Sequence, residues 1–258
     1  LSSSPDLVFV HRLVSFMPLL RATGQLPPLL FDLDDIEHNS LWRRLLRGPR
    51  QLQNLATLSC IPAIMLAERA AIRLSTTSFV CSDLDVTKLK RRFGVRNVQV
   101  VPNSIRIPAM VSRCQFPRLL MLGNYGYAPN SQGIEFFVER ILPILQKAIP
   151  SVELWVAGPN ERALSFALNP PSGVRVLGFV DNLDELYSQV AAVICPIFSG
   201  GGTRVKVIEA ASYGMPIIST RIGAEGIELE NGSEILIGDK PAAFANACAR
   251  VLTDPGLA

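Results

Sequence analysis

The sequence predicts an α/β protein with two lobes, each built on a parallel sheet. Strand-like and helix-like runs alternate with little interruption from residue 118 to residue 252, and a shorter alternation of the same kind precedes residue 105. Hydrophobic residues make up 48% of the 258 residues, which suits parallel sheets that are buried on both faces. A formal net charge of +3 is too small to indicate a nucleic-acid-binding protein.

The C-terminal half, residues 118–258, carries the clearer pattern. Its strand-like runs lie at 118–123, 152–158, 174–179, 191–196, 216–220 and 234–238. Its helix-like runs lie at 131–148, 161–167, 183–190, 204–213 and 242–252. This alternation predicts right-handed βαβ units in a doubly wound sheet, whose ligands bind at the carboxyl ends of the strands.

Residues 1–105 predict a second α/β lobe, joined to the first by a proline-containing linker at 106–117. Strand-like runs lie at 6–10, 27–33, 77–82 and 98–103. A helix over 52–74 is expected to bend at Pro62, which cannot donate a helical hydrogen bond. A second helix is expected to start at the cap residue Ser82 and to end at Gly94.

A glycine run between strand 191–196 and the next helix predicts an anion site. Residues 200–202 are all glycine, Thr203 can cap the helix, and Arg204 and Lys206 place two cations in its first turn. Cations at a helix N-terminus oppose the helix dipole, so a bound anion such as a diphosphate explains them better than the helix does. Glu209 shares a helix face with Lys206 and could accept hydrogen bonds from sugar hydroxyls. The alternative is a tight turn followed by a surface ion pair between these two side chains.

The stretch GGGTRVKVIEAASYGMP resembles the donor-site signature of family 4 glycosyltransferases, which are retaining enzymes with the GT-B fold of two Rossmann-like lobes. The match to the family phrase EA-x-x-x-G-x-P consists of Glu209, Ala210, Gly214 and Pro216. The family's first glutamate would fall at Gly201, so the chain resembles a branch that reads Gly-Thr-Arg-x-Lys. The resemblance implies that Glu209 holds the ribose. It also implies that backbone N–H groups of Gly201 and Gly202 replace the missing glutamate.

Loops after other strands supply the remaining candidate donor-binding residues, which are Gly123, Asn124, Tyr125, Gly158, Phe179 and Val180. The resemblance implies that the loop beginning at Gly123 approaches the diphosphate through its backbone. It implies that backbone groups around Phe179 and Val180 hold the nucleobase. Plain turns between strands and helices remain the alternative.

In the N-terminal lobe, FDLDDIEHNSLWRRLLRG follows a strand into a charged segment. Asp35 and His38 are candidates for acceptor contact or proton transfer, with Asp34 and Glu37 beside them, because the pKa of histidine suits proton transfer near neutral pH. The alternative is that Asp35 caps a helix and that His38 is solvated.

A basic patch follows, made of Trp42, Arg43, Arg44 and Arg47. It could lie against an anionic lipid surface or a lipid-phosphate acceptor, or form an ordinary solvated helix face. Five cysteines are scattered without a CxxC pair, and there are two histidines, so neither a metal site nor a disulfide framework is predicted.

The resemblance implies a metal-independent retaining hexosyltransferase with no cofactor besides its substrate, a nucleotide-diphosphate sugar. The expected acceptor is a glycan or lipid-linked molecule of exopolysaccharide or cell-envelope synthesis. The expected location is the cytoplasm, with peripheral contact at the inner face of the membrane left open. The N-terminal lobe is expected to be incomplete and the chain to be a fragment of a longer enzyme. A catalytically inactive nucleotide-binding scaffold and a GT-B nucleotide-sugar epimerase are the alternatives, whereas an oxidoreductase is disfavoured because no G-x-G-x-x-G follows the first strand of either lobe.

Overall fold

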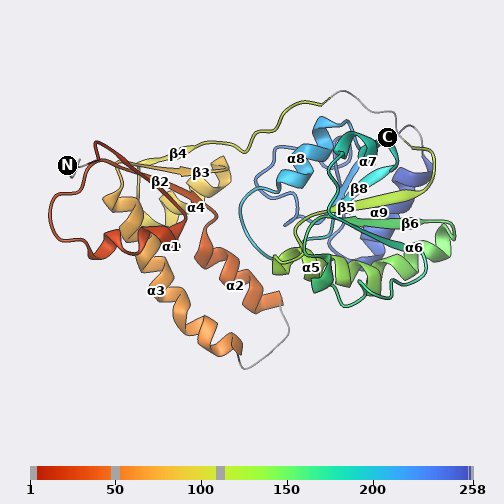
Figure 1. The fold of residues 1–258 in the computed structure, drawn as a ribbon, viewed down its shortest axis with the longest axis horizontal. Coiled ribbons are helices and arrows are strands. Elements are labelled where there is room, and N and C mark those ends of the chain that lie inside the picture. The colour runs from red at the N-terminus through yellow and green to blue at the C-terminus, as the bar shows by residue number, and fades with distance from the viewer. Residues whose placement is uncertain (1–4, 48–52, 109–113, 255, 257–258) are drawn as a thin grey trace. The chain divides into compact units, whose positions relative to one another are not determined.

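The computed structural model describes residues 5–47, 53–108, 114–254 and 256, without the side chains of Arg47 and residues 53–57. It confirms an α/β fold with two parallel sheets, shown in Figure 1. The chain divides into two compact units. Unit 1 comprises Leu1–Asn103 with Ser199–Thr203, and unit 2 comprises Ser104–Phe198 with Arg204–Ala258. Of the predicted linker, residues 109–113 lie outside the described residues.

Unit 1 is built on four parallel strands in the order β1-β2-β3-β4. The strands are β1 (Val8–His11), β2 (Leu29–Asp34), β3 (Thr77–Val80) and β4 (Val98–Val100). The helices are α1 (Leu13–Phe16), the 3-10 turn η1 (Leu19–Arg21), α2 (Glu37–Arg47), α3 (Gln53–Leu74) and α4 (Asp83–Phe93). Phe16 and Phe31 are fully buried in its core, with ring centroids 4.7 Å apart in an edge-on arrangement. This core is separate from that of unit 2.

The predicted caps of α4 are confirmed. The hydroxyl of Ser82 accepts a hydrogen bond of 3.2 Å from the N–H of Asp85. Gly94 ends the helix at φ 65°, a left-handed conformation that glycine adopts without steric cost. Pro62 lies inside α3, and the bend expected there stays a prediction.

Unit 2 is built on six parallel strands in the order β10-β9-β8-β5-β6-β7. The strands are β5 (Arg118–Leu122), β6 (Glu153–Ala157), β7 (Val174–Gly178), β8 (Ala192–Cys195), β9 (Ile217–Ser219) and β10 (Leu236–Ile237). Leu119, Leu120 and Met121 of β5 have no exposed surface, as expected for a central strand covered on both faces. The strand order reverses between β5 and β8, and ligands of doubly wound sheets bind at such a reversal.

The helices of unit 2 are α5 (Ala128–Phe136), the π-turn η2 (Phe137–Ile141), α6 (Leu142–Ala148), the 3-10 turn η3 (Glu161–Ala163), α7 (Leu183–Ser188), α8 (Val205–Ser212) and α9 (Pro241–Thr253). Figure 1 shows α7 and α8 on one side of this sheet and α5 and α6 on the other. The helices therefore cover both faces, as the doubly wound prediction requires.

The predicted helix at 161–167 is wrong, because only the single turn η3 forms there. Asn160 enters the segment in a left-handed conformation at φ 61°. The N–H of Ser165 donates to Glu135 Oε1 at 2.9 Å rather than continuing a helix. A side chain of α5 therefore satisfies the backbone here, which short-range propensity does not reveal.

Candidate functional site

Two loops meet at the strand reversal of unit 2, one following β5 and one following β8. Lys206, in the first turn of α8, connects them by donating a hydrogen bond of 2.8 Å to Asn130 Oδ1 in α5. Asn130 in turn donates to the backbone oxygen of Asn124 at 2.8 Å. The ammonium group is therefore held against the loop after β5, where the sheet topology predicts a ligand.

The electrostatic setting of Lys206 is unusual. Burial lowers its pKa to about 8, while Cys195 acts to raise it and Arg204 to lower it further. Two cations at the positive end of one helix repel each other, and a negatively charged ligand would relieve that repulsion. The site is therefore suited to an anion.

Arg204, and not Thr203, is the residue that precedes the first turn of α8, so the predicted cap is wrong. Arg204 is 7% exposed and has extended backbone angles (φ −91°, ψ 100°), and no side chain caps the helix there. The end of α8 thus keeps its orphan backbone N–H groups next to Arg204 and Lys206, as an anion site requires.

Glu209 lies on α8 and is half-buried, and that burial raises the pKa of its carboxyl group. Its Oε2 accepts a hydrogen bond of 3.2 Å from the hydroxyl of Tyr187, which opposes that rise. Tyr187 stacks on Tyr213 with ring centroids 4.1 Å apart, and Tyr213 donates to Asp184 at 2.6 Å. Tyr187 therefore fixes the orientation of the carboxylate. The alternative of an ion pair with Lys206 is wrong, because within the described part of the chain the two side chains have these other partners.

The loop after β5 is shaped by glycine. A Cβ atom at Gly123 would lie 2.7 Å from Lys206 Nζ and 3.0 Å from Asn130 Nδ2. Gly158, at φ 127°, approaches so closely that a Cβ there would overlap the carbonyl of Gly123. Gly123 thus leaves the space that the Lys206 ammonium occupies, and Gly158 leaves the space that the backbone of Gly123 occupies.

Tyr125 and Asn124, which lie in this loop, make hydrogen bonds within unit 2. The N–H of Tyr125 donates to Pro159 at 3.0 Å, its buried hydroxyl donates to Met121 at 2.8 Å, and burial raises its pKa. Asn124 Oδ1 accepts from the N–H of Gly126 at 2.9 Å. Both residues hold the loop in shape, so the backbone contact to a diphosphate predicted for Tyr125 would compete with its hydrogen bond to Pro159.

Phe179 and Val180 follow β7, also at a carboxyl strand end. The side chain of Phe179 is 69% exposed, whereas Val180 packs against the core. The contact of this segment's backbone with a nucleobase stays a prediction.

We expect Gly123→Ala to weaken nucleotide binding about tenfold, because the added methyl group would displace the Lys206 ammonium. Stability should change little, since the displaced atoms are the far ends of flexible side chains. Calorimetric titration with a nucleoside diphosphate measures the affinity. Gly126→Ala is the matched control, because a Cβ there meets only amide groups, of Asn124 and Asn160, at 3.1 and 3.3 Å. Equal affinity in the two variants would contradict the placement of Lys206.

Residues 199–203 belong to unit 1, and there a Cβ at Gly201 would overlap Asp35 Oδ1 and lie 2.5 Å from Ser40 Oγ. Gly202 has φ 66°, and the side chain of Asn103 donates to Thr203 Oγ1 at 2.6 Å. A side chain at position 201, such as the family glutamate, would therefore have to displace the side chains of Asp35 and Ser40.

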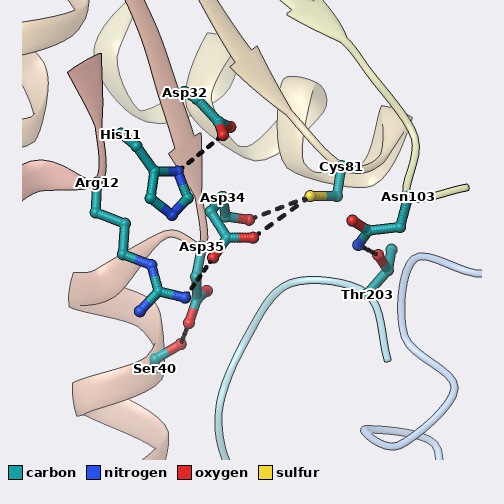
Figure 2. A network of polar contacts seen from close by, with 9 residues as sticks. All are labelled: His11, Arg12, Asp32, Asp34, Asp35, Ser40, Cys81, Asn103 and Thr203. Carbon is teal, nitrogen blue, oxygen red and sulfur yellow. Dashed lines mark hydrogen bonds and ion pairs between the residues drawn. The ribbon is translucent and has the colours of Figure 1, made fainter. Parts of the chain in front are cut away.

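Asp35 belongs to a polar network at the carboxyl end of β2, drawn in Figure 2. Ser40 donates to Asp35 Oδ2 at 2.6 Å, and Arg12 pairs with Asp34 at 2.8 Å. Arg12 (φ 64°) and Asp34 (φ 59°) both have left-handed backbone conformations, which are uncommon for residues other than glycine. Cys81 donates weakly to the carbonyl of Asp34 at 3.5 Å, and its pKa is raised to about 11 by burial and by nearby carboxylates.

His38 is buried in contact with Glu68, so the alternative of a solvated side chain is wrong. Its ring Nδ1 is hydrogen-bonded to Glu68 Oε2, and its backbone N–H donates to Glu68 Oε1 at 3.3 Å. Burial, Glu68 and Asp35 together raise the pKa of Glu37.

In the predicted basic patch, Trp42 is 48% exposed and Arg43 donates to the carbonyl of Gly200 at 3.1 Å. The side chain of Arg47 lies outside the described residues.

Two features are absent from the described residues. No group of three His, Cys, Asp or Glu side chains is placed to hold a metal ion there. No helix among those residues has the length and apolar character needed to span a bilayer.

Comparison with known proteins identifies the family of the chain. The family described as "Glycosyl transferases group 1" matches residues 116–254, more than half of the chain. An uncharacterised 44.6 kDa protein in the cps region of Klebsiella pneumoniae is 24% identical over 135 residues, which are 49% of this chain and 35% of that protein.

Solved structures show the same fold. Sucrose-phosphate synthase from Thermosynechococcus elongatus superposes with a TM-score of 0.74 and 18% identity over 98% of this chain and 66% of its own. HepE from Anabaena, solved with UDP-glucose, superposes with a TM-score of 0.70 and 16% identity. The superposition covers 98% of this chain and 70% of HepE. The chain thus spans about a third of its curated relative and two thirds of the synthase. With the family match over residues 116–254, the conclusion is that this chain belongs to the group 1 glycosyl transferases, which have the GT-B fold.

Proposed function

We propose that the chain is part of a retaining family 4 glycosyltransferase that moves a hexose from a nucleotide-diphosphate sugar to a glycan or lipid-linked acceptor. The observation that carries the proposal is Lys206, held by Asn130 at the strand reversal three residues before Glu209. A structural neighbour was solved with UDP-glucose, which makes uridine diphosphate sugars the first donors to test. The relative encoded in a cps region supports a role in polysaccharide assembly. The proposed location is the cytoplasmic side of a membrane.

In the proposed mechanism, breakage of the sugar–phosphate bond leaves negative charge on the departing diphosphate. Arg204, Lys206 and the N-terminus of α8 stabilise that charge in place of a divalent metal ion. Glu209, oriented by Tyr187, accepts hydrogen bonds from the ribose and so positions the anomeric carbon. The acceptor hydroxyl attacks from the face that the diphosphate leaves, and a phosphate oxygen takes its proton.

The low pKa of Lys206 gives this mechanism a pH dependence. The free chain loses the Lys206 proton above about pH 8, whereas a bound diphosphate favours the charged ammonium and raises its pKa. Binding therefore takes up a proton above that pH, so affinity should fall with rising pH, up to about tenfold per unit. Calorimetry between pH 7 and pH 9.5 measures this slope. A slope equal in the wild type and in Lys206→Met would contradict the assignment.

NMR of the chain with UDP-glucose, UDP-galactose or UDP-N-acetylglucosamine tests the proposal as a whole. The proposal predicts release of UDP and slow transfer of the sugar to water, with the donor's anomeric configuration first in the product. Inversion would overturn the retaining assignment. Interconversion of the sugars without UDP release would indicate an epimerase. UDP binding without turnover of any donor would indicate an inactive scaffold.

A further inference from the structure

A cavity of about 450 Å³ lies in unit 1, between α2 and α4. Its lining residues are Ile36, His38, Asn39, Arg43, Lys88, Leu89, Arg91 and Arg92. Four of these described lining residues are cations and none of them is acidic, although Lys88 already pairs with the carboxylate of Asp85 at 2.9 Å. The volume falls within the usual range for small-ligand pockets, roughly 300–1,000 Å³.

The spacing on α4 directs the charges into this cavity. Lys88, Arg91 and Arg92 follow one another at i, i+3 and i+4 and share a helix face, whereas Lys90 is exposed and does not line the cavity. The helix dipole favours cations in the last turn of α4 on any face. Arg43, from α2, lines the same space, and its guanidinium also donates to the carbonyl of Gly200 at 3.1 Å.

A buried pair adds a polar group to the wall. His38 is 3% exposed and Glu68 is fully buried, and the two contact each other through Nδ1 of the ring. Because Glu68 holds Nδ1, the other ring nitrogen, Nε2, is the one that can serve a ligand in the cavity that His38 lines. A fixed imidazole and the amide of Asn39 thus supplement the cations.

We propose that this cavity is a second anion site, which binds a phosphate-bearing molecule of diphosphate size. Arginine guanidinium groups match phosphate oxygens with paired hydrogen bonds, and Lys88 contributes a point charge. The volume leaves room for a group attached to the phosphate. The ligand is either a free phosphate compound or the head of a lipid-linked diphosphate. Only the second identification rests on the proposed function.

The test titrates inorganic pyrophosphate into the full chain that carries Arg204→Ala and Lys206→Met, so that the donor site contributes little. Adding Arg91→Ala and Arg92→Ala should weaken binding at least tenfold. The matched control adds Lys90→Ala and Arg96→Ala, two exposed cations of the same unit outside the cavity, and should change affinity less than twofold. Circular dichroism checks the fold, which both pairs should leave intact because all four side chains are exposed.

Absence of pyrophosphate binding before the cavity substitutions, or equal losses in the two pairs, would overturn the proposal. Farnesyl diphosphate separates the two sources. If farnesyl diphosphate binds at least tenfold more tightly than pyrophosphate, and Arg91→Ala with Arg92→Ala removes that binding, the ligand is a lipid-linked diphosphate. Equal affinity for the two compounds supports a free phosphate compound. UDP titration of a chain that carries Arg91→Ala and Arg92→Ala, with Arg204 and Lys206 intact, reports on the donor site alone. Its failure would count against the proposed function and leave the cavity result unaffected.

Discussion

Lys206→Met is expected to weaken binding of the donor nucleotide about a hundredfold, which corresponds to about 3 kcal/mol. The substitution removes a partly buried ammonium that Asn130 holds in the loop after β5, and methionine keeps most of the apolar stem. The fold should persist, because an uncharged side chain removes the desolvation that lowers the lysine pKa to about 8. Titration calorimetry with UDP, beside a thermal melt of each protein, measures both effects.

Lys147→Met is the matched control for that experiment, because Lys147 is an exposed cation of α6 in the same unit. It removes the same charge and should leave UDP affinity within about twofold, as expected for screened surface charges. If both variants bind UDP alike, the ammonium of Lys206 does not contact the diphosphate.

Glu209→Ala is expected to lower kcat/KM about a hundredfold, since hydrogen bonds donated to a charged group are worth about 1.5–3 kcal/mol and the ribose also loses its orientation. Alanine is the strongest helix former, so α8 should remain folded. Comparing UDP with 2′-deoxy-UDP isolates the contact. The wild type should prefer the hydroxylated nucleotide, and the variant should lose most of that preference.

Glu228→Ala, at an exposed position of unit 2, is the control for general loss of negative charge. It should keep both the turnover and the preference for the 2′-hydroxyl. Retention of that preference in Glu209→Ala would mean that the carboxylate of Glu209 does not hold the ribose.

The strands of unit 2 could be predicted because parallel strands buried on both faces read as continuous apolar runs. Helix 161–167 could not be excluded from local sequence, because Glu135 satisfies the N–H of Ser165 from a distant helix. The prediction that Thr203 caps α8 is wrong for a related reason. Thr203 has the right chemistry for a cap, but its hydroxyl accepts from Asn103, a hundred residues earlier.

The candidate site likewise contains residues that the sequence predicts and partners that it does not. Arg204, Lys206 and Glu209 lie within one short motif, so their proximity follows from the helix repeat. Their partners are distant in sequence, since Asn130 lies 76 residues from Lys206 and Tyr187 lies 22 from Glu209. His38 is a further example, because Glu68 lies 30 residues away on another helix. No pattern in a single sequence marks such pairs, although they decide which side chains are held in place.

Calorimetric titration of the full chain with UDP, GDP and ADP, beside Arg204→Ala, decides whether a donor diphosphate binds at the start of α8. We expect one nucleoside diphosphate to bind clearly more tightly than the others, and Arg204→Ala to abolish that binding while the fold is kept. A well-folded wild-type chain that binds none of the three, or an Arg204→Ala variant that binds as tightly as the wild type, would contradict a donor diphosphate site at the start of α8.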